Sequence, residues 1–432
     1  MDNRIHLNVT FFNLITFISL FNYLLLKRIK LTFEKKINEN IPFEKYMDEL
    51  LWNNLVTKIN LGSPLNSTDF MIRLQQYPLL IISEKVVSSH QKYNHSKSST
   101  FKILNDTTIT NPFSYFKKSK ICKEYFKFDK VNMDLKCLLV NEINSEEGIN
   151  YPVLLGLGLK EQIQKEKEYE GINFIEQLKE ANLISSYVFT IKFIDNYKGE
   201  IIIGEKPEEY DSKCHSEGFR SVKTEIITAS MVWSMSFDEL YVNNKLLEND
   251  IVVRLKLESG VIKPTYNLER YLNENYFDFY LKNSYCSKKR SEDLISYYYI
   301  CNKSIDIKNF PEINFHLKPF EMNFTLTYED LIVEYQDKYF FLIVFMEYVE
   351  RFEVGYPLMK KYQFVFDQDK KMIGLYKDFK KPFSFINFFI FLFVFIIFCL
   401  LAFSTYVFYK KQRRKRQNEI DDNYEYFPNE NI

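Results

Sequence analysis

Short apolar runs separated by turn residues dominate the chain from about Lys45 to Tyr376. The runs are rich in Val, Ile, Phe and Tyr, which pack well on a pleated, half-buried surface. Runs of this kind predict strands, so we expect a mostly β body. Two helices are expected within it, over Phe174–Asn182 and Leu268–Leu281. The predicted strands include residues 55–61, 70–74, 79–82, 187–194, 200–203, 239–242, 251–257, 313–317 and 340–345.

The N-terminal end carries an apolar segment, Leu7–Leu26, between Arg4 and the pair Lys27-Arg28. This pattern predicts a secretory signal peptide over residues 1–26, or a signal anchor if the segment is not cleaved. No site with small residues distinguishes the two, so both remain open. Either one sends the following chain into the secretory pathway.

A second apolar segment, residues 383–409, carries no charged residue. It exceeds the ~20 residues that a helix needs to cross a bilayer. Its length and its lack of polar periodicity disfavour the alternative, a buried core helix. The basic cluster Lys410–Arg416 follows at once, which by the positive-inside rule places the tail, residues 410–432, in the cytoplasm. We therefore expect a single-pass type I protein whose transmembrane helix contacts the lipid bilayer.

Glycosylation sequons support a lumenal or extracellular body. They lie between the two apolar segments, where an N-glycan would be added in the secretory pathway. The candidate acceptors are Asn66, Asn94, Asn105, Asn302 and Asn323.

The cytoplasmic tail contains Tyr424-Glu425-Tyr426-Phe427, which has the Tyr-x-x-hydrophobic form of an endocytic sorting signal. It lies shortly after the basic cluster, in a polar segment that an adaptor could reach. We therefore expect residence in an endosomal or lysosomal membrane, or at the cell surface.

The charge balance excludes some partner classes. Lys+Arg and Asp+Glu number 57 each, so no global field favours nucleic acid or an acidic substrate. The five histidines form no ligand spacing with the cysteines, so we expect no metal and no cofactor. No Gly-x-Ser-x-Gly, P-loop or His-Glu-x-x-His motif occurs.

The cysteines suggest disulfides in an oxidising compartment. Cys286 and Cys301 flank a polar loop, and a disulfide is the expected link between them. Cys122 and Cys137 form the other close pair, for which a disulfide is also predicted. Cys214 is then left as a buried thiol or as an intermolecular partner.

The closing runs Gly355–Asp367 and Met372–Leu375 form one of seven motifs along the body. The order and spacing of the seven resemble those of pepsin-like aspartic proteases (peptidase A1). The most specific is the closing pair of strands within 355–375, which is similar to the last strands of that family. The resemblance covers nearly the whole body and implies a bilobal, mostly β fold, with an N-terminal lobe over residues 45–218 and a C-terminal lobe over 219–378. The other six motifs are Ile59–Pro64, Asn94–Phe101, Leu154–Gly158, Asn182–Phe189, Gly199–Gly204 and Phe310–Phe315.

The resemblance also implies where two catalytic aspartates belong. In this family each lies in an Asp-Thr/Ser-Gly turn, and the two share a proton while one activates a water. In this chain Gln75 stands at the first aspartate position, followed by Gln76 and Tyr77. A Gln side chain cannot take a proton from water. Because Tyr77 replaces the glycine, we expect the loop to have changed shape.

The second turn keeps more of the family pattern. Glu258-Ser259-Gly260 stands where Asp-Thr/Ser-Gly is expected, so Ser259 and Gly260 fit. Glu258 keeps a carboxylate but is one methylene longer, and ~1 Å of misplacement can cost ~100-fold in rate. An ordinary solvated Glu is the alternative interpretation. Tyr115 matches the tyrosine of the family's flap.

These residues predict a membrane-anchored pseudoprotease. The family's groove between lobes would bind an extended peptide or a protein segment by backbone hydrogen bonds, without cleaving it. Two alternatives remain open: an active aspartic endopeptidase that uses a non-standard carboxylate pair, and a structural surface glycoprotein whose cleft has collapsed.

Overall fold

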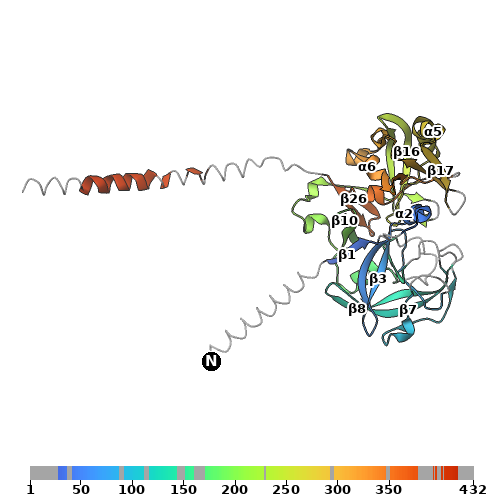
Figure 1. The fold of residues 1–432 in the computed structure, drawn as a ribbon. Helices are drawn as coiled ribbons and strands as arrows, with labels where there is room; N and C mark the ends of the chain where they lie inside the picture. The colour runs from blue at the N-terminus through green and yellow to red at the C-terminus, as the bar shows by residue number, and fades with distance from the viewer. Residues whose placement is uncertain are drawn as a thin grey trace, which may run out of the picture. The chain divides into compact units, whose positions relative to one another are not determined.

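The computed structural model describes residues 28–36, 41–86, 92–110, 116–143, 151–159, 171–227, 230–291, 296–346 and 351–377, together with parts of a helix between residues 393 and 416. The chain forms two units, Met1–Lys377 and Asp378–Ile432. The first unit is mostly β, as predicted, and is consistent with a bilobal pepsin-like fold (Figure 1). The predicted signal segment, residues 1–26, lies outside the described residues.

Most of the predicted strands are present. The strands of the first half are β1 (Ile29–Lys35), β2 (Leu55–Leu61), β3 (Asn66–Arg73), β4 (Leu80–Ile82), β5 (Lys102–Ile103), β6 (Ile109–Thr110), β7 (Phe116–Phe128), β8 (Val131–Ile143), β9 (Val153–Gly156), β10 (Val188–Phe193) and β11 (Lys198–Ile203). Those of the second half are β12 (Phe219–Lys223), β13 (Ile226–Ile227), β14 (Ser230–Met231), β15 (Ser234–Val242), β16 (Lys245–Leu255), β17 (Cys286–Arg290), β18 (Ser296–Asn302), β19 (Ile313–Leu317), β20 (Met322–Leu326), β21 (Ile332–Tyr335), β22 (Lys338–Phe341), β23 (Phe345–Met346), β24 (Phe352–Val354), β25 (Phe364–Asp367) and β26 (Met372–Tyr376).

One large sheet joins the two halves. Its order is β12-β26-β25-β10-β11-β1-β2-β3-β9-β4-β8-β7-β5. The closing strands β25 and β26 therefore return to pair with β10 and β12 near the middle of the sequence. Two smaller sheets, β20-β19-β15-β16-β24 and β17-β18-β22-β21, belong to the second half.

Strand β1 was missed by the sequence analysis, which began the body at Lys45. It lies between β11 and β2, with Phe33 opposite both Gly199 and Thr57. Ile29, Leu31 and Phe33 alternate with more exposed residues and are buried in the main core. This period of two is the pattern of a strand with one buried face.

Helix α2 (Tyr46–Leu51) also precedes the predicted strands, yet it packs among elements of the second half (Figure 1). Met47 belongs to a separate apolar cluster with Tyr298 and Ile300 of β18 and Phe340 of β22. Tyr46 stacks on Tyr335 with ring centroids 3.8 Å apart. The N-terminal segment therefore covers an apolar face of the second half.

The two predicted helices are present with shifted bounds. Helix α3 (Phe174–Glu180) begins after Asn173, whose Oδ1 accepts hydrogen bonds from the backbone amides of Ile175 and Glu176, as an N-cap residue does. The second predicted helix is continuous from α4 (Tyr266–Leu272) through a π-helical turn to α5 (Asp278–Lys282). Two further short helices are α6 (Tyr328–Leu331) and α7 (Tyr356–Met359).

The second unit contains a helix in which residues 403–416 are continuous, include the predicted basic cluster and are exposed. Among the residues that the structure describes, no helix is both long enough and apolar enough to cross a membrane. Much of the predicted span, residues 383–409, lies outside the described residues, and so does the tail motif at Tyr424.

Candidate functional site

The same local arrangement of strands surrounds a loop in each half of the body. β3 pairs in parallel with β9, with Phe70 opposite Val153. β16 pairs in parallel with β24, with Val253 opposite Phe352. The first loop, residues 74–79, follows β3, and the second loop, residues 256–262, follows β16.

The two loops rejoin their partner strands at matching positions. After the first loop, Leu80 pairs with Leu154, two residues before Gly156 (156 − 154 = 2). After the second, Lys263 pairs with Glu353, two residues before Gly355 (355 − 353 = 2). Gln75 lies five residues before Leu80 (80 − 75 = 5), and Glu258 lies five residues before Lys263 (263 − 258 = 5). The two side chains therefore occupy equivalent positions of a duplicated arrangement.

Both loops close over a glycine. A Cβ at Gly156 would lie 2.5 Å from the carbonyl oxygen of Gln76, and a Cβ at Gly355 would collide with the carbonyl oxygen of Ser259 in the same way. Each loop can approach its strand this closely only because no side chain stands there. The geometry that presents a side chain from each loop is thus intact, although the side chains have changed.

Gln75 uses its side chain to bind the other half of the body. Its Nε2 donates to the backbone carbonyl of Trp233, 3.2 Å away, and to that of Leu255 at the end of β16. The amide is therefore committed to two backbone acceptors. Such a group holds two loops together, but it supplies neither a base nor an acid.

Glu258 is also held by the opposite loop. Its Oε2 accepts a hydrogen bond from the backbone amide of Leu74, 3.3 Å away, and the residue is only 6% exposed. The alternative interpretation, an ordinary solvated Glu, is therefore wrong, because the carboxylate is buried and hydrogen-bonded. The side chains at both dyad positions join the two halves.

Residues of the N-terminal segment lie against the second loop. The backbone amide of Asn53 donates to the carbonyl of Glu258 over 2.9 Å, and its Nδ2 donates to the carbonyl of Leu257. The amide of Gly260 donates to the carbonyl of Leu51, 3.0 Å away. A Cβ at Gly260 would collide with the backbone of Leu50, so this close approach requires glycine. Residues 51–53 therefore form hydrogen bonds with the backbone of the second loop.

Tyr77, which stands where the family has a glycine, is a core residue here. It is 3% exposed, and its hydroxyl donates to Oε2 of Glu176 in α3, 2.9 Å away. Its carbonyl accepts from Nδ2 of Asn173, the residue that caps α3. The tyrosine thus ties the first loop to α3.

The hydroxyl of Ser259, by contrast, bonds within its own loop. Its Oγ donates to the carbonyl of Val261, 3.0 Å away, and its amide donates to the carbonyl of Lys256. The hydroxyl therefore shapes the second loop.

The nearest described ion pairs belong to Glu353 of β24. Its two oxygens lie 3.1 Å from Arg254 and 2.8 Å from Lys256. Burial raises the pKa of the Glu353 carboxyl, but the charge and hydrogen bond of Lys256, together with the charges of Lys263 and Arg254, outweigh it and leave the pKa below its usual value. Glu353 is thus held ionised by its cations, which does not suit an acid that must share a proton.

Both tryptophans of the chain lie at this site, a signal that the sequence analysis did not use. Trp52 pairs with Ser259 across an isolated bridge, and the guanidinium of Arg73 lies 5.4 Å from the centroid of its ring. Trp233 accepts from Gln75 and donates its Nε1 to the carbonyl of Leu157, 2.9 Å away.

The flap residue predicted at Tyr115 lies outside the described residues. In the described part of the chain, no group of three or more His, Cys, Asp or Glu side chains could hold a metal ion.

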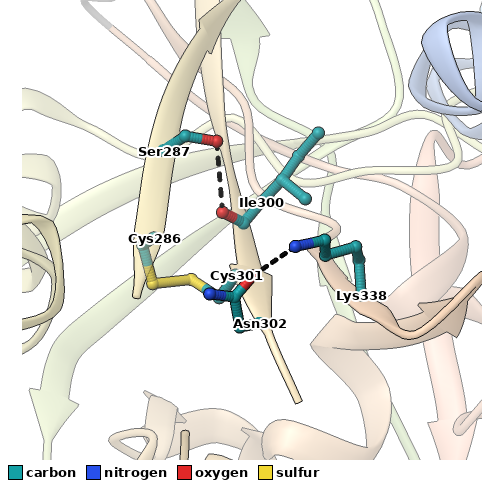
Figure 2. The surroundings of a disulfide bond; sticks show 6 residues. All are labelled: Cys286, Ser287, Ile300, Cys301, Asn302 and Lys338. Carbon is teal, nitrogen blue, oxygen red and sulfur yellow. Dashed lines mark hydrogen bonds between the residues drawn. A yellow bond between two sulfur atoms is a disulfide. The ribbon is translucent and has the colours of Figure 1, made fainter. Parts of the chain in front are cut away.

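The predicted disulfide Cys286–Cys301 is present and links β17 to β18 at directly opposite positions (Figure 2). Cys122 and Cys137 are also directly opposite on β7 and β8, but their Sγ atoms lie 3.0 Å apart, well beyond an S–S bond of ~2.05 Å. The prediction of a second disulfide is therefore not met in the structure. Burial raises the pKa of the Cys137 thiol, and the pair packs as apolar core.

The sequon asparagines are at the surface, with one qualification. Asn302 is half-buried at the end of β18, and its Oδ1 accepts from Nζ of Lys338 (Figure 2). The four exposed ones are Asn66, Asn94, Asn105 and Asn323.

The comparisons with known proteins agree with the duplicated geometry. The family model described as eukaryotic aspartyl protease matches residues 67–377, which include both loops and the closing strands. A search of curated proteins found no match. The matched region covers more than half of the chain, and the chain therefore belongs to the eukaryotic aspartyl protease family, with the pepsin-like (peptidase A1) fold.

Proposed function

We propose that this protein is a membrane-anchored pseudoprotease, which binds a peptide or protein segment in or near the interlobe cleft without cleaving it. The observation that carries the proposal is the use of both dyad side chains. Gln75 donates its amide to the carbonyls of Trp233 and Leu255, and Glu258 accepts from the amide of Leu74.

Peptide hydrolysis by this fold needs two carboxylates that share one proton, one of which removes a proton from water. An amide at Gln75 leaves Glu258 without a partner. In addition, Oε2 of Glu258 accepts from the backbone amide of Leu74, so a shift of the carboxylate toward a water would break this contact between the loops. The two side chains at the dyad positions therefore serve contacts between the loops.

The binding part of the proposal rests on the fold. Pepsin-like domains recognise extended chains by backbone hydrogen bonds, and the second loop in this chain is paired in that manner by its own residues 51–53. The loop has therefore kept its capacity to pair with an extended backbone. A ligand would bind beside this segment or displace it.

The membrane part of the proposal rests on residues 383–409 and the basic cluster after them. We propose a lumenal or extracellular body and a short cytoplasmic tail, in an endosomal or lysosomal membrane or at the cell surface. Alkaline extraction of membranes tests the anchor: the full chain should stay in the membrane pellet, and a chain ending at Lys377 should not. Replacing Tyr424 with Ala should raise the surface pool if the tail motif acts as a sorting signal.

The binding proposal is tested by incubating the full-length chain with a mixture of peptides of defined sequence. The expected result is a subset of peptides that is retained and recovered intact by mass spectrometry. Retention of none of them, with the protein shown to be folded, would favour the structural glycoprotein. Recovery of cleaved peptides would favour an active endopeptidase.

A further inference from the structure

A cavity of about 400 Å³ lies beside the second loop, where β1, α2 and α7 meet. Its walls include the rings of Tyr46, Tyr197 and Tyr356. Tyr197 is 51% exposed, so the cavity opens to solvent on that side, whereas Tyr356 is 6% exposed and forms its floor. Its volume lies within the ~300–1,000 Å³ that small-molecule sites occupy.

Two lysines of this cavity face the same aromatic ring. Nζ of Lys35, the last residue of β1, lies 4.6 Å from the ring centroid of Tyr356. Nζ of Lys360, just after α7, lies 5.4 Å from the same centroid. Among the described residues neither ammonium has a carboxylate within 4.0 Å. Two cations thus contact one ring and have no described counter-ion.

The other charged groups of the cavity are engaged elsewhere, with one exception. Lys36 pairs with Glu34 at 2.7 Å, and Asp330 pairs with Lys361 at 2.8 Å. Glu334 pairs with Lys303, and Glu329 accepts a hydrogen bond from the hydroxyl of Tyr328, 3.2 Å away. The exception is Glu49 of α2, which acts on Lys35 only at longer range.

The electrostatics agree with a missing anion. Burial, and then the charge of Lys360, lower the pKa of Lys35 to about 8, against a weaker opposing effect of Glu49. Burial also lowers the pKa of Lys360 and raises the pKa of Glu49. Each of these groups is desolvated and, in the described part of the chain, has no oppositely charged group within 4.0 Å, which is costly for its charged form.

We propose that this cavity binds a carboxylate attached to an apolar group, with Lys35 and Lys360 holding the carboxylate and the tyrosine walls packing on the apolar part. A carboxylate between two ammonium groups forms charge-assisted hydrogen bonds, which are stronger than neutral ones. The inference goes beyond the proposed function, because it requires neither the loss of catalysis nor the membrane anchor.

Two sources could present this chemistry: a free organic acid, or the C-terminal residue of a peptide. The probes are 3-phenylpropionate and the dipeptide Ala-Phe, each compared with its amide. Binding to the full-length chain is measured by titration calorimetry. We expect at least one of the two acids to bind at least tenfold more tightly than its amide, and the comparison between the acids identifies the source.

Four variants locate the site. Lys35→Met and Lys360→Met should each weaken binding of the acid by about tenfold or more, since each removes one charge-assisted contact. Lys36→Met is the matched control, because Lys36 lines the same cavity but already pairs with Glu34. Its affinity should stay within twofold of the unchanged protein. Glu49→Gln removes the one carboxylate that competes for Lys35, so it should tighten binding.

A second readout uses the unchanged protein and needs no variant. A bound carboxylate raises the pKa of Lys35, so binding at pH 8 to 9 should be accompanied by proton uptake, seen as a dependence of the heat on the ionisation enthalpy of the buffer. Glu49, Lys360 and Tyr356 face Lys35, and only Lys35 and Lys360 titrate toward this range. The proposal would be overturned if the acids and their amides bound with equal affinity. It would also be overturned if the acids bound without proton uptake and with unchanged affinity in both lysine variants.

Discussion

The backbone amide of Leu74 donates a hydrogen bond to Oε2 of Glu258 over 3.3 Å, across the boundary between the two halves of the body. The carboxylate at the second position expected for the catalytic pair therefore has a structural partner in the opposite loop. The side chain next to Leu74, Gln75, makes the reciprocal contacts with the carbonyls of Trp233 and Leu255. The centre that would carry the chemistry in an active relative holds the halves together in this chain.

If Gln75 holds the halves together, truncating it should destabilise the protein. Gln75→Ala should lower the free energy of unfolding by about 1–3 kcal/mol, because it leaves the buried carbonyl of Leu255 without this donor, whereas the carbonyl of Trp233 still accepts from the amide of Leu255. Gln76→Ala is the matched control, since the side chain of Gln76 makes no hydrogen bond among the described residues. Its change should stay within about 0.5 kcal/mol. Denaturant unfolding followed by intrinsic fluorescence measures both, and equal effects would contradict the structural role of Gln75.

Restoring an acid at this position should make the protein sensitive to pH. In Gln75→Asp the new carboxylate faces two carbonyl oxygens and lies in the loop that contacts Glu258. Its folded pKa should therefore be raised above the unfolded value of ~3.9. An acid whose pKa is raised by folding destabilises the protein as the pH rises. The free energy of unfolding of the variant should therefore fall further below that of the unchanged protein at pH 7 than at pH 4. A constant difference between the two pH values would contradict this geometry.

Full repair of the first loop should fail for a reason that the sequence did not show. Tyr77→Gly removes a buried ring and its hydrogen bond to Glu176, and large-to-small core changes cost ~2–5 kcal/mol. The triple variant Gln75→Asp, Tyr77→Gly, Glu258→Asp should therefore unfold at a much lower temperature than Gln75→Asp with Glu258→Asp. Differential scanning calorimetry compares the two, and similar melting temperatures would show that Tyr77 is not a core residue.

The closing strands, both helices and both loop positions could be predicted from the sequence, because they depend on local patterns and on motifs in a fixed order. The role of Gln75 could not be predicted, since its acceptors are backbone carbonyls far away in the sequence. Trp233 is 158 residues from Gln75, and Leu255 is 180 residues from it. Strand β1 was missed because its partners, β2 and β11, are set by the tertiary fold. Nor does spacing reveal that Cys122 and Cys137 stay unbonded, since their separation of 15 residues equals that of Cys286 and Cys301.

The burial of Lys35 predicts an unusual pH dependence of stability. Its pKa is about 8 in the folded protein and 10.5 for an exposed lysine, so the unfolded chain binds more protons between these values. The contribution of Lys35 to stability should therefore rise with pH above 8. The rise should be smaller in Lys35→Met. Unfolding of both proteins is measured from pH 7.5 to 9.5, so that the ionisation of tyrosines, common to both, cancels in the comparison. Equal slopes would contradict the prediction.

The disulfide Cys286–Cys301 should stabilise the second half measurably. It closes a loop with a sequence separation of 15, for which the chain-entropy model gives ~3 kcal/mol. The double change to Ser should lower the free energy of unfolding by about 2–4 kcal/mol, whereas changing Cys122 and Cys137 to Ser removes no covalent link. Peptide mapping without reduction should find Cys286 linked to Cys301, and finding both as free thiols would contradict the structure.

Incubation of the purified full-length chain with a denatured protein at acid pH, with and without pepstatin, tests the central claim most directly. We predict no cleavage, since Gln75 supplies no carboxylate and Glu258 is held by Leu74. A Glu258→Ala preparation controls for contaminating proteases, because any cleavage that it shares with the unchanged protein comes from elsewhere. Pepstatin-sensitive cleavage that is present in the unchanged protein and absent from Glu258→Ala would contradict the claim.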